Sequence, residues 1–97
     1  MLDTKMEIRL SRIFRKQYAK ASQKVQLVVR ERFRIFEKDT HHPLLRNHLL
    51  TGEYHGFRSI NITGDWRAIY GEKMLPTGKV AIDFMLLGTH SQLYKKN

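Results

Sequence analysis

The chain has 97 residues, 41 % of them hydrophobic and 28 % charged, which is the composition of a globular protein rather than a disordered one. We expect a single domain, residues 1–97, that buries only about 60 to 65 % of the surface its unfolded chain exposes. The chain contains 18 Lys and Arg but only nine Asp and Glu, which gives a formal charge of +9. This charge favours a polyanion, above all nucleic acid, or an acidic protein as partner. A solvated basic surface without such a partner is the simpler alternative.

Composition also excludes several classes of protein. The chain has no cysteine, and therefore no disulfide, no thiolate nucleophile and no cysteine-based zinc site. The longest apolar run near the C-terminus, residues 84–87, is far shorter than the roughly 18 residues that span a bilayer, and no signal peptide is visible. We expect a cytoplasmic protein that does not engage a membrane.

The first half of the chain predicts a strand and two helices. Residues 6–10 alternate apolar and charged side chains, which is typical of a short strand. Ser11 can cap a helix from Arg12 to about Ala21, and Ser22 can cap a longer one. Apolar residues recur in that longer helix at three- and four-residue steps. They are Val25, Val28, Val29, Phe33 and Phe36.

The second half predicts three strands. Pro43 ends the helical pattern, and residues 44–48 can form one helical turn. Residues 54–62 alternate as a strand, Thr63 and Gly64 turn the chain, and residues 65–70 return antiparallel to it. After a loop at 71–78, residues 79–87 are apolar on both faces, which predicts a central strand. One face of it carries Val80, Ile82, Phe84 and Leu86.

This order, β-α-α-β-β-β, predicts an α+β fold. Helices and strands are segregated along the chain, so we expect a mainly antiparallel sheet with the two helices packed on one face. The opposite face would then stay open, and a nucleic acid could lie on it.

Acid–base chemistry is the reaction type that the side chains favour. The five histidines lack the helical pairing with an acid that zinc hydrolases use, so we expect no metal and no cofactor. Two histidines flanking a phosphodiester could remove one proton and deliver another. His48 and His90 each lie at the end of a strand region, although a surface histidine without function is the commoner case.

Charged groups of the predicted hairpin could converge on a phosphate-bearing ligand. His48 precedes the hairpin, Arg58 lies in its first strand, and Asp65 and Arg67 lie in its second. The alternatives are structural: Asp65 would only cap the turn, and Arg67 would pair with Asp83.

Two stretches resemble the RelE/ParE superfamily of bacterial type II toxins, most closely its messenger-RNA-cleaving RelE/YafQ-type branch. They are HLLTGEYHGFRSINITGDWRAIYGE and VAIDFMLLGTHSQLY. The most specific pieces are the Gly-Phe-Arg strand, the Asp-Trp strand with its Tyr, and the terminal Gly-Thr-His-Ser. The resemblance covers nearly the whole chain and implies a RelE-like toxin domain.

The YafQ pattern falls on His48, Asp65, His90 and Tyr94 as catalytic residues. The RelE pattern adds two basic residues, Arg58 and Arg67, as substrate-binding groups. The chain departs from the YafQ pattern at Ser59 and Asn61, where that branch can carry an Asp and a further His. An asparagine can hydrogen-bond at this position but cannot shuttle protons.

The resemblance implies metal-free cleavage of messenger RNA on the ribosome, started by the ribose 2′-hydroxyl. His48 and His90 would serve as base and acid in either order, while Asp65 orients an imidazole or holds the 2′-hydroxyl. The two arginines would stabilise the phosphorane, and Tyr94 would stack on a base, help in proton transfer, or only pin the tail. A cognate antitoxin protein is the implied partner.

Two other functions stay open at this point. Members of the same superfamily poison DNA gyrase, and a fold alone does not separate the two activities. A non-catalytic basic module that binds RNA or an acidic protein is the third possibility.

Overall fold

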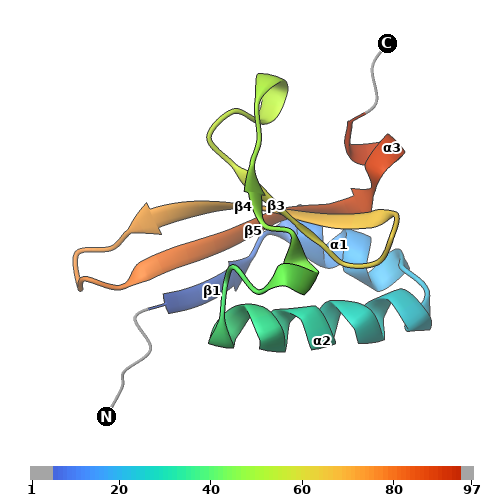
Figure 1. The fold of residues 1–97 in the computed structure, drawn as a ribbon, viewed down its shortest axis with the longest axis horizontal. Helices are drawn as coiled ribbons and strands as arrows, with labels where there is room; N and C mark the ends of the chain where they lie inside the picture. The colour runs from blue at the N-terminus through green and yellow to red at the C-terminus, as the bar shows by residue number, and fades with distance from the viewer. Residues whose placement is uncertain (1–5, 95–97) are drawn as a thin grey trace.

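The computed structural model describes residues 6–94, which form one five-stranded mixed sheet with strand order β1-β5-β4-β3-β2 (Figure 1). β1 runs parallel to β5, and the other neighbouring strands are antiparallel. The elements are β1 (Met6–Leu10), α1 (Arg12–Lys20), α2 (Gln23–Lys38), the 3₁₀ helix η1 (Pro43–Leu45), β2 (His48–Leu49), the 3₁₀ helix η2 (Gly52–Tyr54), β3 (Arg58–Asn61), β4 (Trp66–Met74), β5 (Val80–Thr89) and α3 (His90–Leu93). The predicted α+β order is confirmed, with β2, η1, η2 and α3 added to it.

Both predicted helix starts are confirmed by their caps. The Ser11 hydroxyl accepts from the amide of Phe14 at 2.9 Å, and the Ser22 hydroxyl accepts from the amide of Val25 at 3.2 Å. Each cap satisfies one of the amides that lack a partner within the first turn of a helix. None of the helices within residues 6–94 has the length and apolar character needed to cross a membrane.

One face of the sheet packs against α1 and α2, and we call it the helix face. Phe84 of β5, an inner strand between β1 and β4, lies in the middle of its core, with ring centroids 4.4 Å from Phe33 and 5.1 Å from Tyr70. The cluster also buries side chains from both helices, which confirms that the two helices share one face. Its buried members are Phe14, Val29, Phe36, Leu45, Ile60, Ile62, Ala68, Tyr70, Ile82, Phe84 and Leu87.

A bulge in β5 corrects the predicted faces of that strand. Tyr70 of β4 lies opposite Phe84, but the preceding Ile69 lies opposite Leu86, so Met85 is an extra residue without a partner in β4. An extra residue shifts the alternation of everything that follows it. Leu87 therefore joins the helix-face core, and Leu86, predicted to face the helices, packs on the other side.

The predicted strand boundaries around the hairpin are wrong at several points. β3 begins only at Arg58, because the chain before it turns through η2 and through Gly52 and Gly56, whose φ angles are +69° and +94°. β4 extends to Met74, so the predicted loop at 71–78 shrinks to a turn. The predicted helical turn at 44–48 is replaced by η1 and β2.

The second face of the sheet, which we call the cleft face, is only partly open, contrary to expectation. Figure 1 shows η2 and α3 on this side, opposite α2. A small cluster of Leu50, Ile69 and Leu93 is buried there. The Phe57 ring lies so close to β4 that a Cβ at Gly71 would approach it to 2.9 Å. The sheet is covered near β3 and β4. The sequence predicts a short tail over residues 91–97, of which 91–93 belong to α3 and 95–97 lie outside the described residues.

Candidate functional site

A cleft of about 610 Å³ lies on the cleft face, between the segment around β2 and the helix α3. Two arginines and two histidines line it, and no carboxylate does. Its lining residues are Arg46, Asn47, His48, Leu50, Asn61, Arg67, His90 and Tyr94. Because every ionisable group in this lining other than Tyr94 is basic, the cleft suits an anionic ligand.

His48 projects from one wall of the cleft, and its ring is oriented by the main chain. Its Nδ1 lies 2.9 Å from the carbonyl oxygen of Arg46. A carbonyl only accepts hydrogen bonds, so Nδ1 must carry the hydrogen. In the neutral ring, Nε2 is then free to accept a proton, as a general base requires. Arg46 has a left-handed backbone, with φ +46°, which ends η1 and turns its carbonyl toward the ring.

Asn47 anchors the same wall to the helix face. Its Nδ2 donates to the carbonyl of Thr40 at 2.8 Å and to the hydroxyl of Tyr70 at 2.7 Å. Arg58 donates from Nη1 to the Asn47 Oδ1 at 3.4 Å. Burial raises the pKa of Tyr70, so its hydroxyl stays protonated at neutral pH. The amide of Asn47 is thus committed to holding the loop that carries His48.

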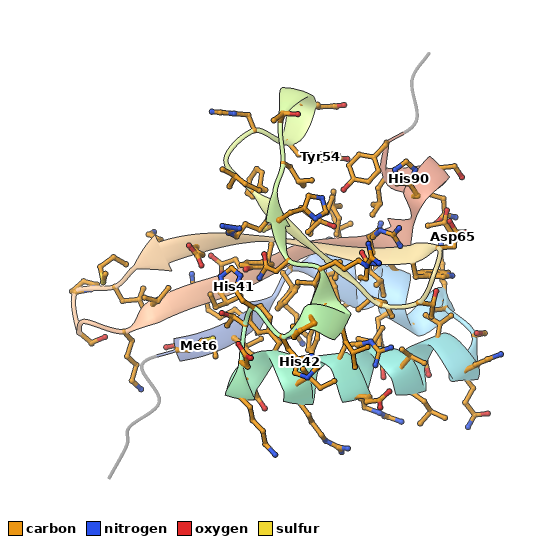
Figure 2. All side chains as sticks on the ribbon, in the orientation of Figure 1. Met6, His41, His42, Tyr54, Asp65 and His90 are labelled. Carbon is orange, nitrogen blue, oxygen red and sulfur yellow. The ribbon has the colours of Figure 1, made fainter. Side chains whose placement is uncertain are left out.

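The other wall is α3, which begins at His90, together with Tyr94, which follows its last residue. Thr89 and Gln92 close a capping box at its start, with each side chain accepting from the other's amide. The amide of His90 donates to the carbonyl of Asp65 at 2.9 Å. The His90 ring lies 4.7 Å from the Tyr94 ring, centroid to centroid. Figure 2 shows His90 and Tyr54 on this side of the sheet, whereas His42 lies near α2.

Arg67 lies in β4 on the cleft face and closes the turn between β3 and β4. Its Nη1 lies 3.1 to 3.2 Å from the carbonyl oxygens of Thr63, Gly64 and Trp66. The suggested pairing of Arg67 with Asp83 is wrong, because Asp83 accepts from Arg9, at 2.6 Å from its Nε. Within residues 6–94, no acceptor contacts Nε or Nη2 of Arg67, so these donors remain available to a ligand.

The structure brings four of the six predicted site residues into the cleft: His48, Arg67, His90 and Tyr94. Arg58 does not join them. It pairs with Tyr70 across the sheet and lies on the helix face, so the predicted convergence of all the hairpin's charged groups is wrong. The exposed side chain of Asp65 does not line the cleft, and only its carbonyl touches the site.

Sequence reasoning missed Arg46 and Asn47 as lining residues. Asn47 could have been included because it directly precedes His48, a candidate base. Nothing in the sequence indicates the left-handed backbone of Arg46. Asn61, noted in the sequence only as a departure from the YafQ pattern, also lines the cleft. In the described part of the chain, no three His, Cys, Asp or Glu side chains gather as metal ligands would.

Comparison with known proteins shows which family and which fold this chain shares. The family model of the YafQ bacterial toxin of type II toxin–antitoxin systems matches residues 6–95. Among solved structures, YafQ from E. coli strain BL21(DE3) is 20 % identical, with a TM-score of 0.72 over 92 % of this chain and 98 % of that chain. No curated protein matches significantly.

Two further structures share the fold. The YoeB/ParE toxin from Agrobacterium tumefaciens is 15 % identical, with a TM-score of 0.70 over 88 % of this chain and 99 % of that chain. A chain of the E. coli DinJ–YafQ toxin–antitoxin complex is 21 % identical, with a TM-score of 0.69 over 93 % of this chain and 98 % of that chain. At these identities the likeness extends to the fold and not to the individual residues of the cleft.

Proposed function

Because the chain belongs to the YafQ family of bacterial toxins of type II toxin–antitoxin systems, we propose that it is an endoribonuclease that cleaves messenger RNA on the ribosome. One observation carries the proposal: two histidines, His48 and His90, line one basic cleft whose lining contains no carboxylate. Such a cleft can hold a phosphodiester between a proton acceptor and a proton donor.

The reaction needs one proton removed and one proton supplied. Nε2 of His48 takes the proton of the ribose 2′-hydroxyl, whose oxygen attacks the adjacent phosphorus. The bond from phosphorus to the 5′-oxygen breaks, and protonated His90 gives that oxygen a proton. The products are a 2′,3′-cyclic phosphate and a free 5′-hydroxyl. His48 is assigned as the base because the Arg46 carbonyl fixes the hydrogen on its Nδ1 and leaves Nε2 available.

The arginines of the cleft supply positive charge where the phosphorane develops negative charge. Arg67 reaches it with the guanidinium edge that the turn leaves unused, and Arg46 lies on the His48 wall. Tyr94 stacks on a base beside the cut. Arg58 acts from the helix face, because its hydrogen bond holds Asn47 in place. Asp65 acts through its backbone carbonyl, which accepts a hydrogen bond from the His90 amide.

The proposed partner is an antitoxin with an acidic segment that covers the cleft. The E. coli YafQ with the same fold has been solved as a complex with its antitoxin DinJ. The charge of +9 on this chain would speed association with an acidic partner, and salt would slow it.

The decisive test is primer extension on messenger RNA from cells induced for this protein. We expect discrete cuts inside translated regions, because the substrate is read on the ribosome. A substrate with a 2′-deoxyribose at the cut position should bind but stay uncut, since it lacks the nucleophile. Intact messenger RNA together with trapped gyrase–DNA complexes would instead identify a gyrase poison.

A further inference from the structure

Tyr54 joins two segments that carry the walls of the cleft, although it does not itself line the cleft. It ends η2, and its hydroxyl donates to the carbonyl of Leu93, 39 residues further along the chain, at 2.9 Å. Its ring meets the Tyr94 ring edge to face, with centroids 5.7 Å apart. Burial raises the pKa of Tyr54, so the hydroxyl stays protonated and can donate.

The helix α3 depends on such outside contacts because it has only four residues. A single helical turn is not stable by itself in water, since its few hydrogen bonds do not offset the ordering of the backbone. At its start, the capping box and the Asp65 carbonyl hold Thr89 and His90. At its end, the carbonyls of the last turn lack partners within the helix. Tyr54 supplies the partner there.

We propose that Tyr54 is a positioning residue that fixes His90 and Tyr94 relative to His48 by binding the C-terminal end of α3. The inference rests on the proposed ribonuclease activity, because it assigns Tyr54 to the geometry of that reaction. Without the hydroxyl, α3 keeps its N-terminal contacts and its buried Leu93 but can pivot about them. His90 then spends less time where it can protonate the leaving oxygen, while the basic groups that bind RNA stay in place.

The test compares Tyr54→Phe with Tyr18→Phe in single-turnover cleavage of ribosome-bound messenger RNA. Tyr18 packs at the edge of the helix-face core, and its hydroxyl makes no hydrogen bond within residues 6–94, so it is a matched control. For Tyr54→Phe we expect the maximal rate to fall about 3- to 10-fold, which is the equivalent of one hydrogen bond. The protein concentration that gives half of the maximal rate should change less than twofold. The control should keep the parent rate.

A second readout does not depend on activity. The Cε1 proton resonance of His90 should move in Tyr54→Phe, while that of His48 stays in place, because only the α3 wall loses a contact. Tyr54→Leu, which also removes the ring contact with Tyr94, should move the His90 resonance further and slow cleavage more than Tyr54→Phe.

Equal parent and Tyr54→Phe rates, or an unmoved His90 resonance in a folded Tyr54→Phe protein, would overturn the proposal. So would a rise in half-saturation with an unchanged maximal rate, because that result would place Tyr54 in RNA binding. Failure of the proposed function is a different result: the parent itself would leave messenger RNA uncut, and the resonances of His90 and His48 would still decide whether Tyr54 positions α3.

Discussion

The two faces of the sheet are built in different ways. The helix face buries a continuous cluster of aromatic and aliphatic side chains centred on Phe84, whereas the cleft face buries only Leu50, Ile69 and Leu93 as a separate group. The helix face is held by packing, which many residues share. The cleft face is held by single hydrogen bonds that fix short segments: Asn47 donates to Tyr70, Tyr54 donates to the Leu93 carbonyl, and the Asp65 carbonyl accepts from the His90 amide. Stability should therefore depend mainly on one face and activity on the other.

Replacing the histidines of the cleft should separate activity from stability most clearly. We expect His48→Ala and His90→Ala each to slow cleavage by roughly 10²- to 10⁴-fold, the usual contribution of one general acid or base. Both side chains are exposed, so the free energy of unfolding should change by less than about 0.5 kcal/mol. Rates on ribosome-bound messenger RNA and denaturant titrations measure the two quantities. His41→Ala, an exposed histidine outside the cleft lining, is the control.

The assignment of His48 as base and His90 as acid can be tested with the same two variants. If His90 is the acid, a substrate whose 5′-bridging oxygen is replaced by sulfur, a leaving group that needs no proton, should restore much of the lost rate in His90→Ala and none of it in His48→Ala. The reverse pattern would exchange the two roles. Unchanged rates in both variants would mean that the chemistry lies elsewhere.

On the helix face, Phe84→Ala should cost about 3–5 kcal/mol of unfolding free energy, because it empties the centre of a packed aromatic cluster. Met85 is the matched control: it is the next residue, but the bulge leaves it 38 % exposed, and Met85→Ala should cost less than about 1 kcal/mol. Thermal or urea unfolding measures both. Similar losses for the two variants would show that Met85 is packed and that the bulge is absent.

Much of the fold follows from local signals in the sequence. The two serine caps, the strand at 6–10 and the apolar stripe of α2 depend on neighbouring residues, and all are confirmed. The bulge at Met85 was not predictable, because strict alternation has no sign of an inserted residue. Arg58 was assigned to the site although alternation places it beside Ile60, which is a core residue of the helix face.

The site is harder to predict because long-range contacts build it. His48, Arg67, His90 and Tyr94 were proposed from the sequence, and they line one cleft. Hydrogen bonds between segments far apart along the chain, such as Tyr54 to Leu93 and Asn47 to Tyr70, hold these residues in place. No pattern of neighbouring residues encodes those pairs.

A smaller effect on stability is expected where β1 and β5 present side chains on the cleft face. Arg9 of β1 and Asp83 of β5 form a two-point ion pair there, with side chains 43 % and 30 % exposed. Its hydrogen bond with Arg9 lowers the pKa of Asp83. For so exposed a pair we expect Asp83→Asn to cost about 0.2–1 kcal/mol at pH 7 and less in high salt.

The sign of the pH dependence follows from that lowered pKa. Stability from the pair is fully present above the unfolded pKa of Asp, about 3.9, and is lost as the pH falls through the lower folded value. Parent and Asp83→Asn proteins should therefore differ at pH 7 and converge in acid, as measured by urea unfolding. A difference that persists or grows in acid would contradict the ion-pair account.

The smallest effect is expected at Ser59, which is fully buried in β3, with its Cα opposite that of His48. Its hydroxyl has no hydrogen-bond partner within residues 6–94. A buried polar group without a partner lowers stability, so Ser59→Ala should leave the unfolding free energy unchanged or raise it by up to about 1 kcal/mol. Ser22→Ala is the control: its hydroxyl caps α2, and its loss should cost about 1 kcal/mol. If Ser59→Ala were instead destabilising and slowed cleavage, the hydroxyl would be hydrogen-bonded in solution, and Ser59 would belong with the groups that hold His48.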